Sequence, residues 1–147
     1  MKTAVVGLLA VGALTWAVQA RSQQAEVLRD LESKDPHPLT IDEVKALMPG
    51  AKVSRVGRSG TTVYWVDEEG GSMIVNSDNK GYGNVRPSTA RGKWNITDDG
   101  RYCVLIEFNR AEPEQWCRFL IKTSEGYYGT TSTAVGTAKV YKIEISK

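Results

Sequence analysis

The chain has 147 residues, of which 41% are hydrophobic and 24% are charged, and this suits a single folded domain with a core of its own. Its formal net charge is +2 at pH 7, and basic and acidic residues alternate along the chain without a run of lysine and arginine. Because nucleic-acid affinity depends on clustered basic side chains, this pattern excludes a nucleic-acid-binding protein.

The first twenty residues, MKTAVVGLLAVGALTWAVQA, have one lysine near the start and then an apolar run with no charge before Arg21. They end in Val18-Gln19-Ala20, a small-x-small pattern that suits signal peptidase. The sequence predicts a signal peptide over residues 1–20. The alternative is an uncleaved membrane anchor, since the apolar run is just long enough to span a bilayer, although Thr15 and Gln19 argue against it.

Residues 21–39 are polar, with Ala25, Leu28 and Leu31 spaced three apart before the break KDPHP. This spacing predicts a short, weakly amphipathic helix followed by a stiff linker.

A second helix is predicted over residues 40–48, at the start of a domain that we expect to span residues 40–147. In LTIDEVKALMPG, Thr40 and Glu43 have the spacing of a capping box, and Pro49-Gly50 ends the helical pattern.

After Gly50 the chain consists of short apolar or alternating runs separated by Gly, Asn, Asp and Ser. Such runs predict strands joined by tight turns. The predicted strands are 52–57, 61–66, 71–76, 82–86, 92–97, 101–108, 115–122, 126–131 and 137–145. Short strands at this spacing are typical of a β-meander, so the predicted fold is mostly β: a small antiparallel, lipocalin-like barrel of about eight strands with a short N-terminal helix.

The two cysteines, Cys103 and Cys117, lie on the two strands of a predicted hairpin whose tip is 109–112. A register symmetric about residue 110 places them opposite each other, with Cβ atoms about 4.5–5.5 Å apart, which is close to what a disulfide needs. A structural zinc site needs four ligands, and the one histidine, His37, is distant in sequence. A redox dithiol is expected as C-x-x-C. In an exported protein the pattern therefore predicts a disulfide.

Alternation divides this hairpin into two faces, and the more apolar and aromatic face is expected to point into the barrel. That face carries Tyr102, Val104, Ile106, Phe108, Trp116, Arg118 and Leu120. An inward Arg118 beside Tyr102 and Trp116 would hold an acidic group of a ligand, with cation–π support from the rings. The alternative is an arginine at the barrel rim that extends to water or pairs with a nearby acid.

Other conspicuous residues have structural interpretations. Trp65 and Trp94 are expected in the core. The acidic clusters Asp67-Glu68-Glu69 and Asp98-Asp99-Gly100 are expected in solvated turns, because neither has the ligand spacing of a calcium loop. No G-x-S-x-G elbow occurs in the sequence, and acids in turns keep ordinary protonation behaviour. We therefore predict no catalytic residue, no metal site and no cofactor.

The segments LTIDEVKALMPG, GTTVYWVDEEGGSMIV, RGKWNITDDGRYCVLIE and WCRFLIKTSEGYY together resemble a family of small exported bacterial proteins of unknown function. The family pattern is a helix ending in Gly, then G-x-W-x-(I/V), G-x-x-C and a second Cys one strand later. The matching residues are Gly50, Gly92, Trp94, Gly100, Cys103 and Cys117. The resemblance covers residues 39–145, departs from the pattern at Glu69-Gly70, where Asp-Gly is commoner, and implies a calyx-like β-barrel without a known activity.

These observations predict a non-catalytic protein of the bacterial cell envelope, periplasmic or secreted. We expect it to bind a small amphiphilic ligand in the barrel, with Arg118, Tyr102 and Trp116 as contacts, or to contact an envelope partner protein through its open end. One alternative is a proteinaceous inhibitor of a cell-wall hydrolase such as lysozyme. Another is a membrane-anchored subunit of an envelope complex, if residues 1–20 are retained.

Overall fold

The structure is a computed structural model that describes residues 26–147 except 58, 84 and 110. Its strands are β1 (His37–Pro38), β2 (Lys52–Val56), β3 (Thr62–Val66), β4 (Ser72–Ser77), β5 (Ser88–Ile96), β6 (Tyr102–Glu107), β7 (Glu114–Thr123), β8 (Gly126–Thr130) and β9 (Val140–Ser146). Its helical elements are the 3-10 helices η1 (Leu28–Lys34) and η2 (Lys80–Tyr82) and the α-helix α1 (Ile41–Leu47).

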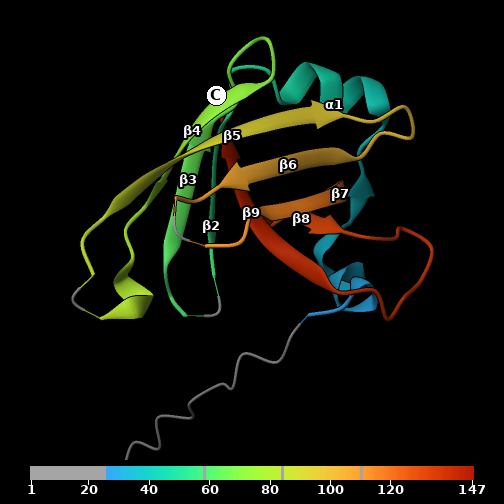
Figure 1. Ribbon diagram of the computed structural model, residues 1–147. Coiled ribbons are helices and arrows are strands. Elements are labelled where there is room, and N and C mark those ends of the chain that lie inside the picture. The colour runs from blue at the N-terminus through green and yellow to red at the C-terminus, as the bar shows by residue number, and fades with distance from the viewer. Residues whose placement is uncertain (1–25, 58, 84, 110) are drawn as a thin grey trace, which may run out of the picture.

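Strands β2 to β9 form a closed antiparallel barrel of eight strands (Figure 1). Each strand pairs with the next in sequence, and the pairing of β9 with β2 closes the ring. Strand β1 lies outside the ring and pairs with β7, with His37 opposite Lys122 and Pro38 opposite Ile121. The predicted fold, a mostly β, eight-stranded antiparallel barrel with a short N-terminal helix, is confirmed.

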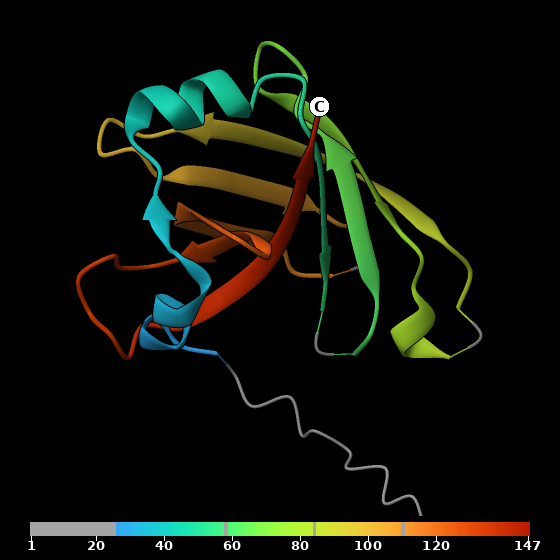
Figure 2. The ribbon, with the colours of Figure 1, turned by 180° about the vertical axis from the view of Figure 1, so that it is seen from behind.

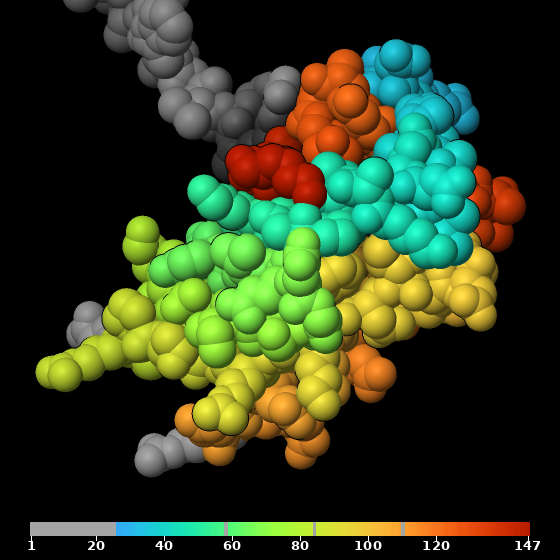
Figure 3. All heavy atoms as spheres, turned by 90° about the horizontal axis from the view of Figure 1, so that it is seen from above, coloured from blue at the N-terminus to red at the C-terminus, as the bar shows by residue number. Residues whose placement is uncertain are grey.

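Helix α1 lies across one end of the barrel (Figures 1 and 3). It begins at the predicted capping box: the Thr40 hydroxyl accepts a hydrogen bond from the Glu43 amide at 3.3 Å, and the Glu43 carboxylate accepts from the Thr40 amide at 2.7 Å. Val44 on its inner face and Met48, the residue directly after its end, have no exposed surface and join the barrel core. Helix α1 therefore covers this end of the barrel with apolar side chains.

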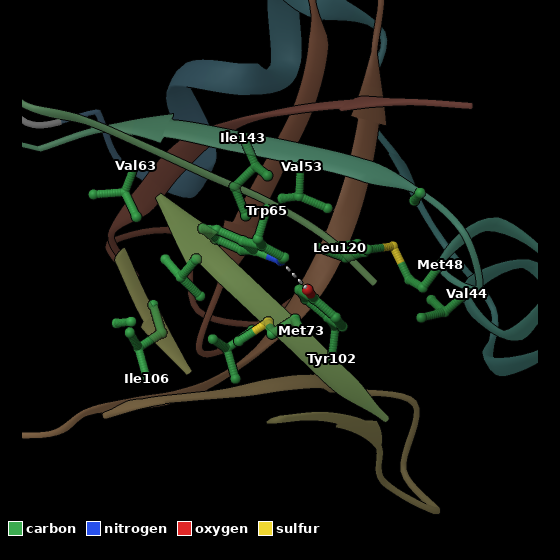
Figure 4. Close-up of a cluster of buried hydrophobic side chains, with 14 residues drawn as sticks. Val44, Met48, Val53, Val63, Trp65, Met73, Tyr102, Ile106, Leu120 and Ile143 are labelled. Carbon is green, nitrogen blue, oxygen red and sulfur yellow. Dashed lines mark hydrogen bonds between the residues drawn. The ribbon is translucent and has the colours of Figure 1, made fainter. Parts of the chain in front are cut away.

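The barrel interior is filled by alternate residues of the strands, which meet in one apolar cluster (Figure 4). The largest members of this cluster include Trp65 of β3, Met73 of β4, Tyr102 and Ile106 of β6, and Leu120 of β7. Each of these five side chains is at most 2% exposed. The part of the barrel near α1 is therefore a packed core.

A smaller apolar cluster lies on the outside of the barrel wall, under η1. It joins Leu31 of η1 to Ile121, Tyr128 and Val140. The predicted amphipathic helix within 21–39 is thus a short 3-10 helix that buries Leu31 against β7, β8 and β9.

The hairpin of β6 and β7 has the predicted register. Cys103 pairs with Cys117, Val104 with Trp116 and Tyr102 with Arg118. The two cysteines form a disulfide with their Cα atoms 4.0 Å apart. The predicted cross-strand disulfide is confirmed, and the predicted face of the hairpin points inward.

The predicted strand at 82–86 is wrong. Lys80–Tyr82 forms η2, and residues 85–87 have no regular structure. Tyr82 and Val85, two apolar residues of this segment, are 66% and 54% exposed. The partner of β4 is instead the longer strand β5, which begins at Ser88 and not at residue 92.

The predicted signal peptide, residues 1–20, lies outside the described residues, as do residues 21–25 of the predicted linker. Within the described part of the chain, none of the helices has the length and apolar character needed to cross a membrane.

Candidate functional site

A hollow of about 830 Å³ occupies the end of the barrel opposite α1. The β2–β3 turn and η2 lie at this end (Figure 2). We call it the mouth hollow; its lining includes Arg55, Val63, Ser77, Phe108 and Glu114, together with Tyr82 and Val85 from the segment between β4 and β5. The lining thus combines apolar side chains with hydroxyl and amide side chains, two arginines (Arg55 and Arg86) and one carboxylate.

Two residues that line the mouth hollow form an ion pair between strands that are distant in sequence. Arg55 of β2 contacts Glu114 of β7 through Nη2 and Oε1, and the two side chains are 18% and 31% exposed. The same Oε1 accepts a hydrogen bond from Trp116 Nε1 at 2.9 Å. Within the described part of the chain, Arg55 Nε is buried and has no hydrogen-bond partner. The pair therefore leaves the buried Nε donor of Arg55 unused.

Arg118 lies next to this pair and is held by aromatic rings. Its Cζ atom is 4.4 Å from the centroid of the Trp116 ring and 3.9 Å from that of Tyr141. Burial lowers the pKa of Arg118, and nearby Arg55 lowers it further, while Tyr141 and Glu114 act in the opposite direction. Its guanidinium makes no hydrogen bond or ion pair with any other residue that the structure describes. Two cations therefore lie near one carboxylate, and only Arg55 contacts it.

A glycine on the neighbouring strand leaves room for Arg118. A Cβ atom added to Gly129 of β8 would lie 2.9 Å from Arg118 Cδ and 2.9 Å from Ile143 Cδ1, closer than real Cβ atoms approach. The stem of Arg118 therefore occupies space that a larger residue in β8 would fill.

The structure brings the three predicted ligand residues together but gives them different surroundings. Trp116 and Arg118 are partly buried near Glu114 and do not themselves line the mouth hollow. Tyr102 has no exposed surface and packs edge-on against Trp116, with ring centroids 5.7 Å apart. Sequence reasoning missed Arg55, Glu114 and Tyr141. Alternation from Trp116 could have placed Glu114 on the inward face, but nothing local to Arg55 or Tyr141 pointed to this site.

A buried polar cluster lies in the core near α1. Asp67 Oδ1 accepts hydrogen bonds from Tyr102 Oη at 2.9 Å and from Trp65 Nε1 at 3.0 Å. Trp65 Nε1 also lies 3.1 Å from Tyr102 Oη (Figure 4). The second carboxylate oxygen, Oδ2, is buried without a partner among the described residues.

The expectation that Asp67 is a solvated turn residue is wrong. Asp67 has no exposed surface, and burial raises its pKa from 3.8 to about 7, although the hydrogen bonds from Tyr102 and Trp65 act in the opposite direction. Burial also raises the pKa of Tyr102. Closure of the barrel and the cover of α1 exclude water from a residue that the sequence places beside a polar turn.

The other singled-out residues have structural roles. Trp65 is a core residue, and half-buried Trp94 packs against the core and donates to the carbonyl of Glu68 at 3.0 Å. Asp99 lies in an exposed turn, where hydrogen bonds from Thr97 and Arg101 lower its pKa. His37 and Glu43 form an exposed pair at 3.1 Å. The described residues contain no cluster of three His, Cys, Asp or Glu side chains that could hold a metal ion.

A second, smaller hollow of about 520 Å³ lies on the outer side of β2, β3, β4 and β9. Tyr64, Val66 and Ile74 line it and are 49%, 42% and 53% exposed. Any test of binding at the mouth hollow therefore has to separate the two apolar surfaces.

Comparison of the chain with protein-family models, with curated proteins and with solved structures finds no match. The function is therefore argued from the site alone.

Proposed function

We propose that the protein is a non-catalytic, extracytoplasmic barrel protein that binds a small amphiphilic ligand in the mouth hollow. The observation that carries the proposal is the lining of this hollow, where Val63 and Phe108 lie beside the partly buried pair Arg55–Glu114. Ligand pockets of this size generally combine a mainly apolar wall with a few placed polar groups. The apolar tail of such a ligand would pack against Val63 and Phe108, and its polar head would contact the charged side chains of the hollow.

Two further features support this proposal. The carboxyl whose pKa is raised toward neutrality, Asp67, lies in the packed core near α1 and not in the hollow, so it is poorly placed to exchange protons with a bound molecule. The disulfide Cys103–Cys117 suits an oxidising compartment such as the periplasm or the exterior of a bacterial cell.

The proposal is tested with the uncharged fluorescent probe N-phenyl-1-naphthylamine, titrated into the purified protein. We expect saturable binding at one site. In Phe108→Ser the affinity should fall about tenfold, because the lost apolar contact corresponds to roughly 1–2 kcal/mol. Val85→Ser should also weaken binding, and since Val85 is exposed on the rim, this change tests the site without disturbing the core.

Ile74→Ser is the matched control, because Ile74 lines the outer hollow. Unchanged affinity in Ile74→Ser together with weaker binding in the two mouth variants supports the proposal. Loss of binding in Ile74→Ser alone would place the probe on the outer surface and contradict it. Melting temperatures of all variants show whether Phe108→Ser acts through unfolding.

The exposed rim of the mouth favours a second candidate, inhibition of a cell-wall hydrolase such as lysozyme. Tyr82 and Val85 project from the segment between β4 and β5 and are 66% and 54% exposed, and exposed aromatic residues are common anchors of protein interfaces. A lysozyme assay with increasing amounts of protein tests this candidate. Inhibition that is lost in Tyr82→Ser would favour it, and unchanged hydrolysis at excess protein would exclude it for that enzyme.

A further inference from the structure

We propose that the ligand carries a singly charged oxyanion head that displaces Glu114 from Arg55 and is held between Arg55 and Arg118. This inference rests on the proposed function and adds the chemical class of the head group and the mechanism by which the site accepts it. Three observations carry it: the unused donors, the uncompensated charge, and the way in which Glu114 is held.

The first observation is the set of unused donors. Nε and Nη2 of an arginine lie on the same edge of the guanidinium, and a carboxylate that binds side-on accepts from both. Glu114 contacts Nη2 of Arg55 through Oε1, while the buried Nε has no partner among the described residues. A buried donor without an acceptor is costly, and an oxyanion bound side-on to Arg55 would satisfy it.

The second observation is charge. Arg118 lies close enough to Arg55 and Glu114 for both to change its pKa. The charge of Arg55 lowers the pKa of Arg118, and the charge of Glu114 raises it. The three side chains together carry one uncompensated positive charge in a partly buried site. The rings of Trp116 and Tyr141 attract the guanidinium of Arg118 but leave its N–H groups without strong acceptors. A single negative charge neutralises the group.

The third observation is that Glu114 accepts a hydrogen bond from a second donor besides Arg55. Its Oε1 also accepts from Trp116 Nε1 at 2.9 Å. When an incoming oxyanion binds to Nε and Nη2 of Arg55, Glu114 keeps its hydrogen bond from Trp116. Its carboxylate is therefore not left without a donor. Glu114 thus acts as an internal anion that occupies the head-group position until the ligand arrives, with the tail of the ligand against Val63 and Phe108.

The test compares decanoate with decan-1-ol, which have the same chain length and differ in the charge of the head. Binding is measured by isothermal titration calorimetry at pH 7.5 and fixed salt. For the unaltered protein we expect decanoate to bind about tenfold more tightly, since a charge-assisted hydrogen bond in a partly buried site has this order of effect. Arg118→Met should remove the preference for decanoate over decan-1-ol.

Glu114→Gln should change the affinity for decanoate in the opposite direction to Arg118→Met. It keeps an acceptor oxygen for Arg55 and Trp116 but removes the competing charge, so decanoate should bind more tightly and its preference over decan-1-ol should widen. Weaker binding of decanoate to Glu114→Gln would overturn the displacement step. Equal binding of the two probes to the unaltered protein would overturn the oxyanion inference and leave the proposed function standing. Binding of neither probe would overturn both.

Discussion

Replacement of Asp67 by Asn should change how the stability of the protein depends on pH. Asp67 has no exposed surface, and its pKa is about 7 in the folded protein against 3.8 for an ordinary aspartate. Between these pH values the folded state holds one proton more than the unfolded state, so the free energy of unfolding falls as pH rises. At about 1.4 kcal/mol per pH unit the total loss is about 4 kcal/mol, complete once the pH is above 7.

Asp67→Asn keeps an acceptor oxygen for Trp65 Nε1 and Tyr102 Oη and cannot ionise. Between pH 5 and pH 8 we therefore expect the unaltered protein to lose about 3 kcal/mol that the variant retains. Urea unfolding followed by tryptophan fluorescence at several pH values measures this difference. The exposed acid Glu69 gives a matched control, because Glu69→Gln should leave the pH dependence as it is. Parallel curves for the unaltered protein and Asp67→Asn would refute the reasoning.

Three further predictions concern the wall of the barrel and the start of the chain. Gly129→Ala should lower the free energy of unfolding by about 1–3 kcal/mol in urea titrations, because its Cβ would lie 2.9 Å from side-chain neighbours. Gly136→Ala is the control and should be near neutral, since the nearest atom there is 3.7 Å away. Equal effects of the two substitutions would count against the crowding argument. Replacing Cys103 and Cys117 by alanine removes a link across a separation of 14 residues and should lower the free energy of unfolding by about 3 kcal/mol. Two alkylated thiols in unreduced protein from the periplasm would contradict the disulfide. N-terminal sequencing of the protein expressed with its first twenty residues should begin at Arg21, and an intact Met1 would favour a membrane anchor instead.

The hairpin of β6 and β7 could be predicted from sequence because its constraints are local. Two cysteines spaced symmetrically about a turn, with alternating apolar residues on both flanks, fix the register, and the register fixes which side chains share a face. The capping residues of α1 are equally local. The strand expected at 82–86 failed because the exposed Tyr82 and Val85 look like core residues in a short window, while η2 and the rim of the mouth are set by the ends of β4 and β5.

The site could be predicted only in part, because its other contacts join residues that are distant in sequence. Arg118 and Trp116 follow from the hairpin, but Arg55 reaches Glu114 only because the ring of eight strands closes. Asp67 belongs to a polar turn in sequence and becomes buried because Tyr102, from a strand that is not its neighbour, lies over it. Contacts across the inside of a closed barrel leave no signal in a single segment.

Native mass spectrometry most directly tests the central claim, that the open end of the barrel holds a small amphiphile. The full chain is expressed with export, purified without detergent or denaturant, and incubated with a total lipid extract of bacterial envelopes. We expect one additional small molecule per chain, retained by Ile74→Ser and present in a much smaller fraction of Phe108→Ser. A spectrum that shows only the mass of the polypeptide, before and after incubation, would contradict the claim.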